Sequence, residues 1–282
     1  MKKPQLILAG IGLSLVFILF VFGRFVPEKE KVSKPTIATT ASANSFSIDS
    51  ARSSAEKNIS DQFNLALKNL EQKLRSASTL AAQLAAYHEL AHFWSEKVNF
   101  FELYAWNEAL AARLENSEKS LNFAARLFLD NLQEDPDGPR RQWKALQAKD
   151  LYERSLKINP NNDSTKVGLG ACYLFGNINN SPMEGIALIR EVVQRDSANV
   201  YAQLTLVKAS MLSGQFDKGI TRLQTVIQVT PQNIEAHLLL ADLYERTDDK
   251  KEAIKWYEKS MQLIAQPEIR QAIKDRIGAL KQ

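Results

Sequence analysis

Residues 240–257, LADLYERTDDKKEAIKWY, carry the clearest fold signal of the chain. A bulky–small pair at the start of this stretch is followed three residues later by Tyr244, and a small–aromatic pair, Ala253 and Tyr257, follows a polar segment. Small residues let two helices approach closely, and an aromatic residue one turn further on fills the gap between them. The stretch therefore predicts two helices that pack against each other across a short polar turn.

The first half of this pattern, the pair at 240–241, recurs four times towards the N-terminus, at 206–207, 169–170, 124–125 and 90–91. In the nearest copy Val207 replaces the small residue and Ser210 replaces the aromatic. The copies are Leu206-Val207 with Ser210, Leu169-Gly170 with Tyr173, Ala124-Ala125 with Phe128, and Leu90-Ala91 with Trp94.

This recurrence resembles the tetratricopeptide repeat (TPR) family, whose repeat is about 34 residues long. The resemblance covers roughly residues 84–267. It implies an all-α, right-handed superhelix of helix-turn-helix repeats, in which the first helices line a concave groove that binds other proteins. We expect residues 51–282 to form this repeat domain.

Two of the steps between copies are longer than the family's repeat, and each contains a turn insertion between helices. Residues 134–139, rich in Pro, Gly and Asp, predict a lengthened second helix that carries Trp143. Ser181 and Glu184 predict a capping box at the next insertion. Insertions at turns, with helices left intact, are what a repeat array should show.

Helices without a partner repeat are predicted at both ends of the array. A flanking helix over residues 51–80 carries an apolar stripe from Ile59 to Leu74. A capping helix over 268–280 closes the C-terminal end, because such terminal helices cover an otherwise open apolar face. We expect its inward positions to be Ile269, Ile273, Ile277 and Leu280.

The N-terminus predicts a membrane anchor. After a short tail at residues 1–5, residues 6–23 are uncharged and mostly apolar, long enough to span about 27 Å as a helix. The alternative is a cleavable signal peptide, but no good small-x-small site directly follows. Residues 24–50 lack large apolar groups in most positions and predict a flexible linker.

The membrane orientation follows from charge. Residues 1–34 hold six Lys or Arg and two acids, whereas the remaining 30 basic and 30 acidic residues balance. The short basic leader favours a cytoplasmic N-terminus, while the basic residues after the span favour the reverse. We expect a single-pass bacterial inner-membrane protein with a periplasmic repeat domain, and no nucleic-acid partner.

The sequence HELAH at residues 88–92 matches the zinc-peptidase pattern H-E-x-x-H. His88 and His92 would then ligate zinc. However, Leu90, Ala91 and Trp94 are already required by the repeat, and nothing nearby reads as a strand. We therefore expect no catalytic residues, no metal and no cofactor, and we expect Cys172 to be a buried apolar residue.

The predicted function is a membrane-tethered scaffold that binds a peptide or helix of a partner protein in the groove, with the assembly of an envelope complex as one candidate setting. A zinc metallopeptidase and a self-assembling structural repeat protein, which would make a homo-oligomer, are the alternatives. The repeat register places ten residues on the groove side: Asn122, Arg126, Val167, Ala171, Leu174, Tyr201, Leu204, Lys208, Asp242 and Glu245.

Overall fold

The computed structural model describes residues 45–179 and 181–282, which belong to one compact unit. These residues form thirteen α-helices and one π-helical segment, η1, with no strand among them. The elements are α2 (Ile48–Asn58), α3 (Asp61–Ser76), α4 (Leu80–His92), η1 (Phe93–Lys97), α5 (Phe101–Glu115), α6 (Glu118–Leu132), α7 (Gly138–Ile158), α8 (Asp163–Phe175), α9 (Pro182–Arg195), α10 (Val200–Leu212), α11 (Phe216–Val229), α12 (Ile234–Arg246), α13 (Lys250–Leu263) and α14 (Pro267–Leu280).

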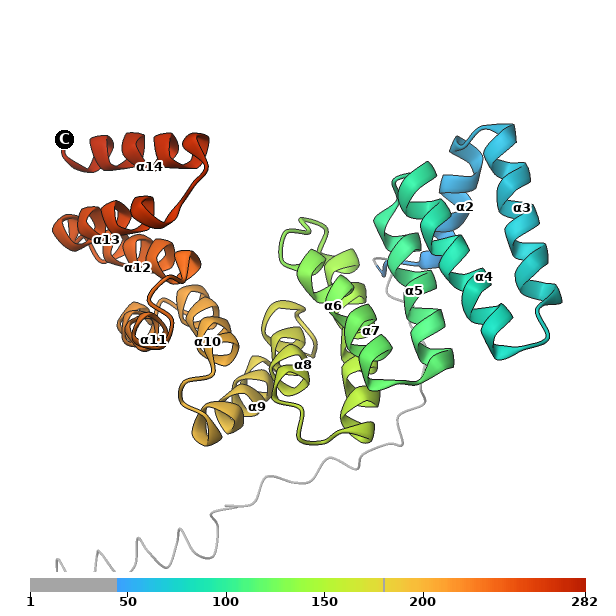
Figure 1. Ribbon diagram of the computed structural model, residues 1–282, viewed down its shortest axis with the longest axis horizontal. Helices are drawn as coiled ribbons and strands as arrows, with labels where there is room; N and C mark the ends of the chain where they lie inside the picture. The colour runs from blue at the N-terminus through green and yellow to red at the C-terminus, as the bar shows by residue number, and fades with distance from the viewer. Residues whose placement is uncertain (1–44, 180) are drawn as a thin grey trace, which may run out of the picture. The chain divides into compact units, whose positions relative to one another are not determined.

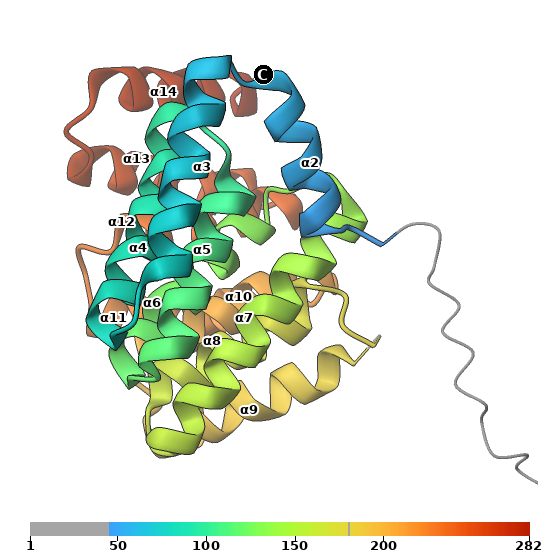
Figure 2. The same ribbon diagram turned by 90° about the vertical axis from the view of Figure 1, so that its right-hand side faces the viewer.

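Ten of these helices form five consecutive pairs, α4/α5 to α12/α13. Each pair packs most extensively within itself, and its second helix then packs against the first helix of the next pair (Figure 1). At the N-terminal end of the array, α3, α4, α5 and α6 lie side by side (Figure 2). The predicted all-α repeat architecture is therefore confirmed.

The first helices of the last four pairs begin at side-chain caps that follow the same steps as the repeat. Ser117, Asn162, Asn199 and Asn233 each accept a hydrogen bond from a backbone N–H in the first turn. Each cap stands the same distance in sequence before the bulky–small pair of its helix. Such caps satisfy backbone donors that the helix leaves unpaired, so each pair begins at a residue type that favours a helix start.

Small and aromatic residues hold the pairs together as the sequence predicts. Trp94 and Phe128 are almost completely buried. Between α8 and α9, a methyl group added at Gly185 would lie only 2.3 Å from the carbonyl oxygen of Gly170. These two helices therefore approach as closely as glycine permits.

The insertion at residues 134–139 lengthens α7 to 21 residues, as predicted. Buried charges fix its start: the carboxylate of Asp135 accepts hydrogen bonds from Arg140 and Lys144, with Lys144 Nζ at 2.7 Å. Lys144 also lies 2.9 Å from Glu102 on α5. The extended helix is thus joined to the neighbouring pair by a network of ion pairs that is largely buried.

The N-terminal flank differs from the prediction in two ways. The helix begins at Ile48 and is capped by Ser47, so the predicted linker ends earlier than residue 50. Phe46 packs against Trp143 with ring centroids 4.8 Å apart, which fixes the chain just before this helix. The single flanking helix predicted over 51–80 is two helices, because Ser60 caps a new start.

The C-terminal flank and the second insertion also need corrections. Ile273 and Ile277 are buried as predicted, but Ile269 is 47% exposed because it lies on the outer side of α14. Ser181 precedes α9 but makes no capping hydrogen bond, since its hydroxyl donates to the Asn179 carbonyl instead. The capping-box prediction was therefore wrong.

The predicted tail, anchor and most of the linker, residues 1–5, 6–23 and 24–44, lie outside the described residues. Among the helices that are described, none combines the length and the apolar character needed to cross a membrane.

Candidate partner-binding groove

The first helices of successive pairs frame two hollows. The first, which we call the tyrosine pocket, has a volume of about 450 Å³ and lies between α6, α7 and the N-terminal ends of α8 and α10. Its lining residues are Asn122, Arg126, Asp130, Tyr152, Ser164, Thr165 and Tyr201.

Hydrogen bonds between neighbouring pairs hold the tyrosine pocket in shape. The Asn162 cap places Thr165 in the first turn of α8, where the hydroxyl donates to Asn122 Oδ1 over 2.9 Å. Arg126 pairs along α6 with Asp130. Tyr201 remains 42% exposed, so the pocket offers an aromatic ring and polar groups to a partner.

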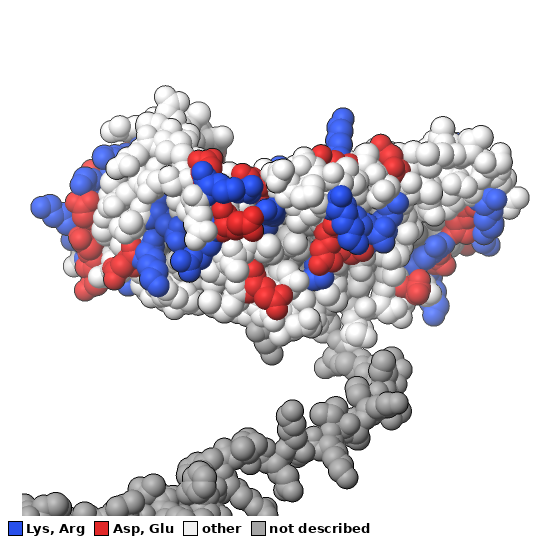
Figure 3. Space-filling view, turned by 90° about the horizontal axis from the view of Figure 1, so that it is seen from below, with Lys and Arg blue, Asp and Glu red and all other residues white. Residues whose placement is uncertain are grey.

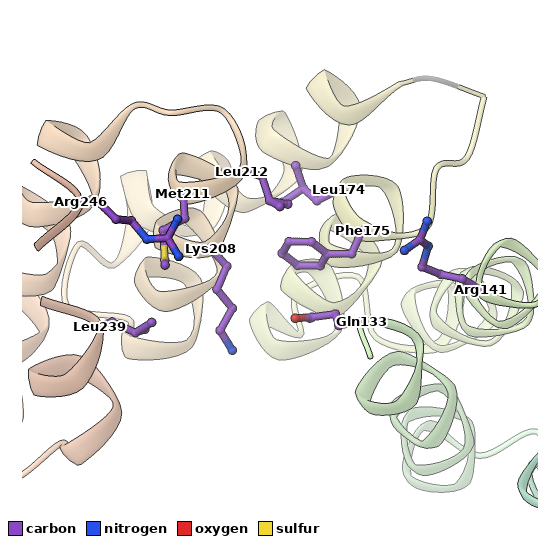
Figure 4. Close-up of a pocket in the computed structure, with 9 residues that line it drawn as sticks. All are labelled: Gln133, Arg141, Leu174, Phe175, Lys208, Met211, Leu212, Leu239 and Arg246. Carbon is purple, nitrogen blue, oxygen red and sulfur yellow. The ribbon is translucent and has the colours of Figure 1, made fainter. Parts of the chain in front are cut away.

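The second hollow, which we call the basic–apolar pocket, has a volume of about 570 Å³ and spans α8, α10 and α12 (Figure 4). In it, Leu212 lies beside Leu174, and the Arg246 guanidinium lies beside Met211. Its lining residues are Gln133, Arg141, Leu174, Phe175, Lys208, Met211, Leu212, Leu239 and Arg246.

All the charged residues that line the basic–apolar pocket are positive. Arg141, Lys208 and Arg246 line it, and none of its described lining residues is an acid. Lys208 lies 2.9 Å from Glu235, and Arg246 lies 2.8 Å from Asp242, so two of the cations have partners outside the lining. Leu212 is 72% exposed and lies in this hollow together with half-buried apolar side chains, so the lining presents an apolar group and not a single exposed leucine.

Five of the ten predicted groove residues line these pockets. Asn122, Arg126 and Tyr201 lie in the tyrosine pocket, whereas Leu174 and Lys208 lie in the basic–apolar pocket. The repeat register therefore brings residues from α6, α8 and α10 to one side of the array.

The structure places the other five elsewhere. Val167, Ala171 and Leu204 are buried, because the first helices pack against each other and against the second helices at these positions. Asp242 is paired with Arg246. Glu245 binds α13 and α14, since it accepts a hydrogen bond from Tyr257 and pairs with Arg276.

Sequence reasoning missed Arg141, Phe175 and Arg246. Arg246 follows Asp242 by one helical turn, and from this spacing their ion pair could have been predicted. Phe175 lies at the last position of α8, beyond the residues that the repeat pattern specifies, and Arg141 belongs to the lengthened start of α7. Their convergence depends on how three pairs stack, which the repeat pattern alone does not specify.

The two histidines of the HELAH stretch are engaged separately. His88 Nδ1 lies 3.1 Å from Glu108 on α5, and His92 Nδ1 lies 3.2 Å from Glu96 within the following π-helical segment. Within residues 45–179 and 181–282, no three His, Cys, Asp or Glu side chains are grouped as metal ligands would be. His88 and His92 thus contact different carboxylates.

Cys172 is fully buried in α8, as predicted. Burial raises the pKa of its thiol well above the usual range, which keeps it protonated. An inert thiol of this kind is a packing residue.

The fold and the two pockets define the class: a helical-repeat protein with hollows along its first helices. A family model described as tetratricopeptide repeat matches residues 210–274, from the end of α10 into α14. Over this stretch the chain is similar to the tetratricopeptide repeat family. No curated protein matches it.

Three solved structures are similar to this chain. A tetratricopeptide repeat protein from Parabacteroides merdae is 14% identical with a TM-score of 0.53, covering 83% of this chain and 85% of its own. MamA from Desulfovibrio magneticus RS-1 is 23% identical (TM-score 0.44; 64% and 94% covered). YrrB, described as a TPR protein with an unusual peptide-binding site, is 15% identical (TM-score 0.42; 74% and 96% covered). The first of these shows the fold.

Proposed function

We propose that the chain is a scaffold that binds a segment of a partner protein across the tyrosine pocket and the basic–apolar pocket. The observation that carries this proposal is the position of the exposed Leu212 and several half-buried apolar side chains beside three cations in one hollow. Exposed apolar groups beside placed polar groups are typical of sites that bury a ligand's side chains.

The chemistry of the lining favours a particular kind of partner. Leu174, Phe175 and Met211 would bury apolar side chains, while Arg141 could pair with a carboxylate of the same segment. The proposed partner segment is therefore apolar with acidic residues, presented as a helix or an extended chain. Tyr201 would contact its other end in the tyrosine pocket.

The proposal includes tethering by residues 6–23 to the bacterial inner membrane, with the array in the periplasm. Its support is the uncharged length of that segment. A cysteine added after Gln282 tests the orientation, since the natural Cys172 is buried. An impermeant maleimide should label it in intact cells with a permeable outer membrane; labelling only after lysis would contradict the periplasmic placement.

Site-specific photocrosslinking in membranes tests the binding function. A photoreactive residue at Tyr201 and, separately, at Leu212 should capture the same protein. The matched control is Leu65, which is 62% exposed but lies on α3, outside both pockets. Capture from all three positions alike would refute a specific groove, and crosslinked dimers of this chain would favour self-assembly.

A further inference from the structure

A third hollow lies between α9, α10 and α11, apart from both pockets of the groove. It has a volume of about 260 Å³. We call it the arginine pocket, because its lining includes Arg190 from α9 and Arg222 from α11, together with Lys218. The lining also includes Ser210, Gln215 and Ile186.

The arginine pocket exists because Ser210 replaces the aromatic residue of the repeat pattern. Ser210 faces Gly219 of its partner helix, as a methyl group built on that glycine would lie 3.7 Å from the Ser210 Cβ. Tyr173 holds the same relation to Gly185 one pair earlier. A large ring at position 210 would therefore occupy the space that the serine leaves open.

The Ser210 side chain lines this space but is held against its own helix. Its hydroxyl donates to the Leu206 carbonyl over 2.9 Å, a hydrogen bond within α10. The corresponding aromatics Trp94 and Phe128 are almost completely buried. Among the five repeats described above, only the α10/α11 pair has a small polar residue at this position of the pattern.

Two of the three positive charges that line the arginine pocket have neutral partners. Arg222 donates to Gln203 Oε1 over 2.7 Å, and Lys218 donates to Gln215 Oε1 over 2.6 Å. Among residues 45–179 and 181–282, no carboxylate lies within ion-pair distance of these two or of Arg190. Asp217, which precedes Lys218 in sequence, is not part of the lining.

Two acids on neighbouring helices pair with cations outside the arginine pocket. Glu191 on α9 pairs with Lys166, and Glu235 on α12 pairs with Lys208. Burial lowers the pKa of the Arg222 guanidinium, and the charge of Arg190 lowers it further. Two guanidinium groups therefore repel each other across the hollow without an anion between them.

We propose that the arginine pocket binds a phosphate-class oxyanion. Two guanidinium groups and an ammonium group from two helices can surround a tetrahedral anion, and guanidinium groups pair with phosphate through two parallel hydrogen bonds. The hollow is smaller than the roughly 300 Å³ at which pockets for drug-sized ligands begin. A free phosphate ion and a phosphoserine side chain both carry the required chemistry.

Calorimetry on the full chain in detergent tests this proposal, with inorganic phosphate and phosphoserine as probes at constant ionic strength. Both Arg222→Gln and Ser210→Tyr should weaken binding by about tenfold or more, because the first removes a donor and the second fills the hollow. Arg270→Gln, which removes an exposed cation on α14, is the matched control and should bind as the unmodified chain does.

The outcomes separate the sources and the proposal itself. Tighter binding of phosphoserine indicates a phosphorylated side chain as ligand, whereas binding of phosphate alone indicates the free ion. Circular dichroism of Ser210→Tyr confirms that the helices remain. The proposal is overturned if neither probe binds, or if all three variants bind equally.

Discussion

Close approach at single residues determines how tightly the pairs pack. Gly185 lies against the Gly170 carbonyl, and Gly219 lies near Leu243 of the next pair. By contrast, Gly278 on α14 has nothing within 4 Å of where a methyl group would lie. A side chain added at Gly185 or Gly219 would therefore clash with its neighbours, whereas one added at Gly278 would not.

Gly185→Ala should destabilise the protein by about 1–3 kcal/mol, because a methyl group must push α8 and α9 apart. Gly278→Ala is the matched control and should be neutral or stabilising by up to about 1 kcal/mol, since alanine favours the helix. Urea unfolding followed by circular dichroism measures both changes. Equal destabilisation in the two variants would show that the tight approach is not responsible.

At the scale of helices, the start of α7 rests on the buried Asp135–Lys144 pair. Burial alone would raise the pKa of Asp135, but hydrogen bonds from Arg140 and Lys144 hold it well below the usual range. The folded pKa is thus lower than the unfolded value of about 3.9. The resulting stability is present above about pH 4 and is lost as the pH falls further.

Asp135→Asn should cost about 3 kcal/mol at pH 7, because Lys144 is left buried with only Glu102 to balance its charge. The difference from the unmodified protein should shrink below about pH 4, where the natural carboxylate begins to lose its contribution. Unfolding free energies from pH 7 to pH 3 measure this. A difference that stays constant over that range would contradict the assigned role of the carboxylate.

Helices were more predictable than their contacts. The spacing of Ala125, Gly170 and Ala241 predicts the pairs because close packing demands small residues there. The break at Ser60 was missed, since the apolar stripe from Ile59 to Leu74 continues across it. The prediction that Ile269 faces inward was also wrong. Helix α14 packs on only one pair, so it buries a narrower apolar stripe than its sequence offers.

Over the whole molecule, the sequence specifies which helices carry the groove but not which side chains stay exposed. Tyr201 and Lys208 were predicted from the register and line the pockets. Val167 and Ala171 share that register and are buried. Stacking between pairs decides the difference, and it depends on contacts between residues far apart in sequence, which a single repeat does not encode.

The charged side chains are dispersed over the face shown in Figure 3, where Lys and Arg lie beside Asp and Glu in several groups with uncharged areas between them. Residues 35–282 carry equal numbers of basic and acidic residues. Recognition of a partner therefore depends on local pockets and not on a large field of one sign. The basic–apolar pocket is the main pocket of this kind in the proposed function.

The binding role of the basic–apolar pocket is tested by the affinity for the partner segment captured by crosslinking at Leu212. Leu212→Asp should weaken binding by about tenfold or more, because it places a carboxylate where the segment buries apolar groups. Leu65→Asp, the same change on α3, should leave the affinity unchanged. Equal affinities for Leu212→Asp and the unmodified chain would contradict the assignment of this pocket as the binding site.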